Sequence, residues 1–173
     1  MPEKEQLFSE GDWVRHLFHG VGQIKGIEEK TLGEETQKYY KVQARKGTFW
    51  IDINQVESDR VRRVVNQEKL YEALIALKAS PQTMSNKHTL RKSRITQVIK
   101  DGDLIGFCNL LRDLQARRVA DKLNTTEQRA HRSLKKRIAS EWSASSGETL
   151  NEINKELNEI IRSIPAPAKN IKN

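Results

Sequence analysis

The chain has 173 residues, of which 36% are hydrophobic and 31% are charged, and its formal net charge is +8. This length fits one domain or two small ones, and no apolar run approaches the roughly 18 residues that a membrane span needs. The single cysteine, Cys108, excludes an internal disulfide framework and a cysteine metal cluster. The polar, acidic opening residues are unlike a secretory signal, so we expect a cytoplasmic protein.

Residues 1–66 show the pattern of a small β-domain, because short runs of apolar and aromatic residues alternate with turn residues. Gly20 and Gly22 favour a tight turn or bulge, and the polar stretch 28–36 predicts a loop. Several short, closely spaced strands are typical of a small twisted barrel. The five expected strands cover residues 13–18, 23–27, 39–44, 48–53 and 61–65.

From residue 67 onward the apolar residues recur at helical spacing, which predicts a bundle of five helices. Gly102 is expected to end the second helix and Asp103 to cap the third. Thr125 and Gln128 have the spacing of a capping box for the fourth helix. We therefore predict an α+β chain, with a five-stranded barrel followed by five helices and a disordered tail over 165–173.

The positive charge is concentrated in one stretch of the chain. Residues 1–66 contain eleven Lys and Arg against eleven Asp and Glu, whereas residues 78–137 contain fifteen against five. A cationic segment of this kind suggests contact with phosphate backbones. The alternative is a helical bundle that is merely basic at its surface.

No motif in the chain supports catalysis. The glycine-rich segment 20–26 lacks the Gly-Lys-Ser/Thr end of a phosphate-binding loop and is expected inside a hairpin, where a tight turn explains its glycines. His16 and His19 lack the neighbouring ligands of a metal site, and Cys108 falls on an apolar stripe as a small buried side chain. We therefore expect a binding protein that is not an enzyme and has no cofactor and no metal.

The basic residues of the second helix are expected to be exposed, because the apolar stripe at 95, 98 and 99 must face the core. Similar basic residues follow on the third and fourth helices. We see no helix patterned to read bases, and therefore expect contacts with the DNA backbone and recognition of its shape.

The run from Phe8 to Ile24, with its Gly-Asp, His-Gly and Gly-Gln steps, resembles the CarD/CdnL family of bacterial RNA polymerase-binding transcription regulators. Residues 39–42 and 61–65 continue the likeness, and Gly102-Asp103 and 111–114 extend it more loosely into the helices. The first module also resembles the polymerase-interacting domain of transcription-repair coupling factor. The likeness covers residues 7–163.

The resemblance implies a Tudor-like β-domain over 1–66 that docks on the RNA polymerase β subunit through an exposed strand edge. At the matching position, Asp52 stands where a basic contact is expected, and Trp50 is either a core or a contact residue. The expected polymerase contacts are Lys30, Thr31, Phe49, Trp50, Ile51, Asp52 and Ile53.

The resemblance also implies a DNA-binding helical domain over 67–164 that contacts the minor groove and backbone and stabilises the open promoter complex. Some family members carry a wedging tryptophan at the position of His88. Here either His88 stacks on a base, Met84 substitutes, or DNA binding is weaker or differently placed. The expected DNA contacts are Lys87, His88, Arg91, Lys92, Arg94, Arg118 and Arg129.

Two functions follow as hypotheses. In the first, a monomeric transcription regulator bridges the polymerase β subunit and promoter DNA and is associated with the nucleoid through the polymerase. In the second, a general nucleic-acid-binding or adaptor protein uses a peptide-binding barrel and makes no contact with the polymerase.

Overall fold

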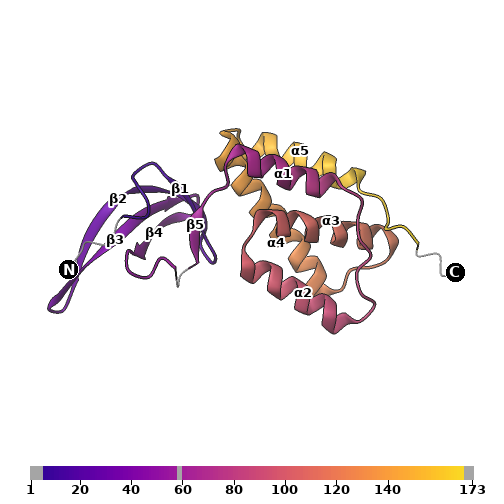
Figure 1. Cartoon of the computed structure of the whole chain (residues 1–173), viewed down its shortest axis with the longest axis horizontal. Helices are drawn as coiled ribbons and strands as arrows, with labels where there is room; N and C mark the ends of the chain where they lie inside the picture. The colour runs from indigo at the N-terminus through magenta and orange to yellow at the C-terminus, as the bar shows by residue number, and fades with distance from the viewer. Residues whose placement is uncertain (1–5, 58–59, 170–173) are drawn as a thin grey trace. The chain divides into compact units, whose positions relative to one another are not determined.

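The computed structural model describes residues 6–57 and 60–169, and its chain divides into two compact units between Val64 and Val65. The first unit contains strands only and the second contains helices only (Figure 1). This confirms the predicted α+β class, with five strands followed by five helices. No helix within the described ranges is long and apolar enough to cross a membrane.

The first unit is a five-stranded antiparallel sheet. Its order is β4-β3-β2-β1-β5, so β4 and β5 form the two edges. The strands are β1 (Trp13–His16), β2 (Gly20–Leu32), β3 (Glu35–Ala44), β4 (Gly47–Asp52) and β5 (Val61–Arg63). β1 ends earlier than predicted because His16 Nδ1 accepts the backbone N–H groups of Phe18 and His19, which turns the chain.

Alternate residues of the central strands form the core of this unit. The backbone N–H of Phe8 donates to the Tyr40 hydroxyl over 3.3 Å, which ties the segment before β1 to β3. A Cβ at Gly22 would lie 2.6 Å from Cγ1 of Val42, so this position admits only glycine. The buried apolar residues of the core are Phe8, Val14, Ile24, Tyr40, Val42, Ile51, Val56 and Val61.

The prediction of a loop over residues 28–36 is wrong, because most of these residues belong to the two strands of the β2–β3 hairpin. The strand pairing continues to Leu32 opposite Glu35, and Gly33 turns the chain with a φ of +70°. Beyond the core this hairpin is largely exposed to water, and cross-strand contacts such as Thr31 with Thr36 replace apolar burial. A polar sequence is therefore compatible with a strand here.

The second unit consists of α1 (Gln67–Lys78), α2 (His88–Asp101), α3 (Leu104–Ala120), α4 (Thr125–Ser146) and α5 (Leu150–Ser163). Gly102 ends α2 in the left-handed conformation and the Asp103 side chain caps α3, both as predicted. The capping box of α4 is one residue earlier than predicted and pairs Asn124 with Glu127. Of the tail predicted to be disordered, residues 165–169 form no helix or strand and residues 170–173 lie outside the described residues.

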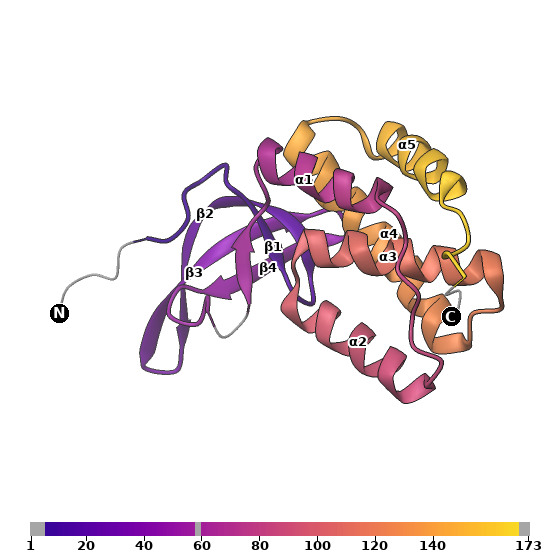
Figure 2. The ribbon, with the colours of Figure 1, turned by 45° about the vertical axis from the view of Figure 1, so that its right-hand side comes forward.

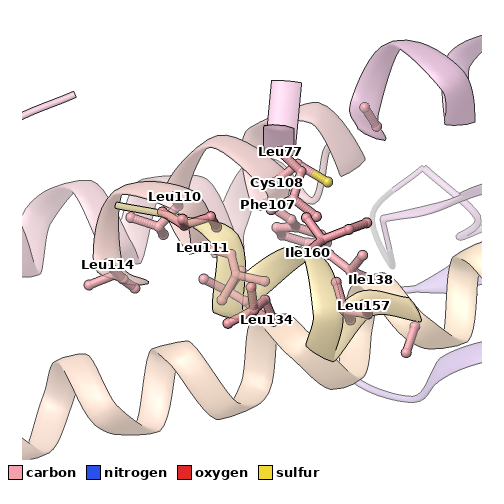
Figure 3. Close-up of a cluster of buried hydrophobic side chains, with 14 of the residues drawn as sticks. Leu77, Phe107, Cys108, Leu110, Leu111, Leu114, Leu134, Ile138, Leu157 and Ile160 are labelled. Atoms are coloured by element: carbon pink, nitrogen blue, oxygen red, sulfur yellow. The ribbon is translucent and has the colours of Figure 1, made fainter. Parts of the chain in front are cut away.

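α3 is the central helix of the second unit and lies between α1 and α2 in both views (Figure 2). The leucines of α3, including Leu110 and Leu111, share one broad side of the helix and are buried. Their neighbours come from α1, α4 and α5, with Leu77, Leu134 and Leu157 in the same cluster (Figure 3). This shared core fixes α1, α3, α4 and α5 against one another.

Candidate functional site

The first candidate surface is β4, which is an edge strand of the sheet. Ile51 points into the core and is fully buried, and its backbone faces Tyr40 on β3, so neither its side chain nor its backbone is open to a partner. Phe49 is half-buried and stacks on the His19 ring with a centroid distance of 4.7 Å. Ile53 follows the strand and donates its N–H to Lys38 O over 3.2 Å. Of the expected contact residues, those from Phe49 to Ile53 therefore lie along this edge, with Ile51 facing inward. Lys30 and Thr31 lie on β2, which β3 separates from the edge strand.

Trp50 lies on the outer face of the sheet and does not belong to the core. It is 40% exposed, and its Nε1–H donates to Glu28 Oε2 over 2.7 Å. Lys30 Nζ lies 3.3 Å from the centroid of the Trp50 ring, a cation–π contact. Hydrogen bonds from Lys41 and Trp50 hold the pKa of Glu28 below its ordinary value. These contacts hold an exposed indole in a defined position beside the edge.

The second candidate surface comprises the exposed basic side chains of the helical unit. Lys87 and His88 are exposed at the start of α2, and Lys92 is exposed one turn later. Arg118 is exposed near the end of α3 and Arg129 on α4. Met84, in contrast, is buried in the helical core, so the alternative that it wedges into DNA is wrong.

The expectation that Arg91 is exposed is wrong. Arg91 is only 7% exposed, because it precedes Ile95 by one helical turn and shares its inward-facing side. Its Nε donates to Glu127 Oε1, and its Nη1 donates to the carbonyls of Ser85 and Asn86 over 2.9 and 2.8 Å. Arg91 is therefore part of the interior of the unit.

Glu127 is the buried anion of this first network. Burial acts to raise its pKa, but the hydrogen bonds from Arg91 and the Asn124 backbone, with the charges of Arg91 and Arg117, hold it below its ordinary value. Glu127 Oε2 accepts from Asn124 N over 3.0 Å and lies 3.5 Å from Arg117 Nε. One carboxylate thus joins α2, the end of α3 and the start of α4.

Asp113 on α3 is the buried anion of a second network. Its Oδ2 accepts from Arg94 Nη2 over 2.7 Å, which leaves Arg94 half-buried rather than free at the surface as expected. Its Oδ1 accepts from Arg112 Nε over 2.8 Å and from the backbone N–H of Gln82 over 2.9 Å. In the sequence, both networks are marked by an acidic residue, Asp113 or Glu127, at an inward-facing helix position within a stretch rich in Lys and Arg.

His131 on α4 is a third buried polar group. Its Nε2 lies 2.8 Å from Gln115 Oε1. Burial, aided by the charges of Arg118 and Lys135, lowers its pKa to about 4. The described part of the chain contains no group of three or more His, Cys, Asp and Glu residues that is arranged to hold a metal ion. The candidate basic surface is therefore formed by exposed basic side chains, whereas His131 is buried inside the unit.

Comparisons with known proteins divide the chain in the same way. A family model described as "CarD-like/TRCF RID domain" matches residues 8–65, and one described as "CarD, C-terminal domain" matches residues 72–158. A Bacillus subtilis (strain 168) protein described as "Putative transcription factor YdeB" is 28% identical over 132 residues, which are 71% of this chain and 82% of that protein.

The two units and these matches define the class of the protein as a transcription regulator related to RNA polymerase interaction. CarD-like proteins are regulators and not enzymes. More particularly, the chain belongs to the CarD family.

Proposed function

We propose that the protein, as a monomer, binds the RNA polymerase β subunit through its β unit and promoter DNA through its helical unit. It thereby stabilises the open promoter complex and catalyses no reaction. The observation that carries this proposal is the division of charge. The edge strand lies in residues 1–66, which are neutral overall, and the positive excess lies in residues 78–137. Membership of the CarD family supports both contacts.

The backbone of β4 supports a contact in which a strand of the polymerase extends the sheet. Because Ile53 N–H donates toward β3, the alternation of an antiparallel ladder directs the N–H of Trp50 away from β3. Unpaired backbone groups at a sheet edge can bind an extended segment of a partner. Lys30, Trp50 and Asp52 lie on the outer face and would contact its side chains.

The exposed basic side chains support contacts with DNA phosphates. Lys87, His88 and Lys92 form a compact group at the start of α2, and Arg118 and Arg129 add charge from α3 and α4. Such contacts carry little sequence information but strengthen binding at low salt. A preference of about 100-fold for the melted complex contributes about 2.8 kcal/mol, enough to shift its population strongly. The protein would then accompany the polymerase on the nucleoid.

Two full-chain variants test the two contacts separately. Trp50→Ala should weaken binding to core RNA polymerase at least about tenfold, whereas Tyr71→Ala, an exposed aromatic residue on α1, serves as its control. The double variant Lys87→Glu and Lys92→Glu should shorten the lifetime of open complexes and leave polymerase binding unchanged. Lys155→Glu, an exposed lysine on α5, is the matched control.

The outcomes distinguish the two functions considered. Loss of polymerase binding in Trp50→Ala alone, and loss of open-complex lifetime in the lysine variant alone, would support the bridging function. Binding of the unmodified chain to DNA without any affinity for core polymerase would instead identify a general nucleic-acid-binding protein. An unchanged lifetime with the lysine variant would remove the DNA contact from the start of α2.

A further inference from the structure

α2 has less apolar anchorage in the helical unit than α5, since its Val98 and Ile99 are only partly buried against the core. Its buried residues are Arg91 and Ile95, whereas α5, of the same length, buries Ile153, Leu157, Ile160 and Ile161. Its N-cap residue, Lys87, makes no side-chain capping bond, and its first turn contains no acidic residue. The position of α2 therefore depends on polar contacts more than that of α5 does.

Two buried carboxylates supply those contacts. Glu127 binds Arg91, which in turn holds the carbonyls of Ser85 and Asn86, the residues just before α2. Asp113 binds Arg94 on α2 and the backbone N–H of Gln82, earlier in the same segment. Glu127 and Asp113 are each 1% exposed. Both ends of the segment 82–87 and the first two turns of α2 are thus tied to acids inside the unit.

We propose that Glu127 and Asp113 are positioning residues that hold the start of α2, with Lys87, His88 and Lys92, in the arrangement that contacts DNA. This inference rests on the proposed function. Its consequence runs against simple electrostatics, because removing a negative charge from a cationic unit should strengthen DNA binding. Here the loss of either acid weakens it.

The physical reason is that a buried guanidinium without its counter-ion is unfavourable. When Glu127 becomes neutral, Arg91 turns toward water and releases the carbonyls of Ser85 and Asn86. The fraction of molecules with α2 correctly placed falls, and the apparent dissociation constant rises in inverse proportion to that fraction. The contacts made by the placed molecules are the same, so the dependence of binding on salt does not change.

The test measures duplex DNA binding by the full chain over a range of salt concentrations. Glu127→Gln and Asp113→Asn should each weaken binding by about tenfold or more, with the slope of log K against log salt unchanged. Lys92→Ala, which removes a phosphate contact, should reduce that slope by about 1. Glu156→Gln removes an exposed acid from α5 and should leave binding as it is or strengthen it slightly.

Amide hydrogen exchange provides an independent measurement that needs no DNA. In Glu127→Gln, the amides of residues 82–95 should exchange at least about tenfold faster, while those of α3 and α5 keep their protection. If Glu127→Gln does not fold, Arg91→Met replaces it, because methionine fills the site beside Ile95 and Glu127 keeps Arg117 as its counter-ion. Arg91→Met should likewise weaken DNA binding with an unchanged slope.

Three results would overturn the inference. One is DNA binding by Glu127→Gln that equals or exceeds that of the unmodified chain. Another is a slope reduced by about 1 in Arg91→Met, which would make Arg91 a phosphate contact. The third is unchanged exchange of residues 82–95 in both variants. If the unmodified chain binds no DNA, the proposed function fails, and the exchange measurement still decides whether the acids position α2.

Discussion

His131 should make the stability of the helical unit depend on pH. Burial first, and then the charges of Arg118 and Lys135, lower its pKa from 6.5 to about 4. Between pH 6.5 and 4, His131 is therefore protonated in the unfolded chain but largely neutral in the folded chain. The stabilisation is complete above pH 6.5 and decreases as the pH falls toward 4. The difference corresponds to about 3 kcal/mol of unfolding free energy.

The perturbation is His131→Gln, which retains a hydrogen-bonding side chain opposite Gln115. Urea unfolding would be followed by circular dichroism at 222 nm, which reports the helices, at pH 7 and pH 4. Between pH 7 and pH 4, the unfolding free energy of the unmodified chain should fall by about 3 kcal/mol more than that of the variant. Other titrating groups, such as Glu127, contribute equally in the two proteins and cancel in this comparison. Equal losses, or a His131 titration near pH 6.5 by NMR, would refute this reasoning.

Three further predictions concern packing and reactivity. Gly22→Ala should destabilise the β unit, seen as faster amide exchange in β2 and β3. Gly106→Ala should not destabilise the helices, because its Cβ would lie 3.7 Å from its nearest neighbours, an ordinary van der Waals contact. Leu111→Ala should reduce the unfolding free energy of the helical unit by about 2–5 kcal/mol in urea titrations, because the side chain is fully buried in the core. Cys108, whose pKa burial raises to about 12, should react with a disulfide reagent at pH 8 only after unfolding.

The elements of the fold were largely predictable because each leaves a local signal. Apolar residues at helical spacing located the helices, and Gly102 and Asp103 marked a boundary through their own backbone and side-chain chemistry. The extension of the β2–β3 hairpin was not predictable, since its residues are polar and their strand conformation depends on pairing with each other. The capping box lies one residue before its predicted position because Asn124, rather than Thr125, has the extended backbone conformation of an N-cap residue.

The candidate site was less predictable because charge does not reveal burial. Lys92 and Arg91 are neighbours in the sequence, yet one is exposed and the other lies against Glu127. A stricter reading of helical spacing places Arg91 on the side of Ile95, and an inward-facing arginine requires a buried acid. The sequence does not say which acid meets which arginine, because α2, α3 and α4 bring them together only in the folded unit.

The edge strand β4 can pair with a second copy of the chain as well as with a different protein. A strand that is open to a partner is also open to a second copy of itself, and long flat edges of this kind lead to aggregation. β4 has only six residues and ends at Asp52, and the charged Lys30 lies over Trp50. A short edge with charges beside it disfavours stacking of identical chains. The short strand and its flanking charges thus leave the edge open to a different partner while opposing its pairing with a second copy.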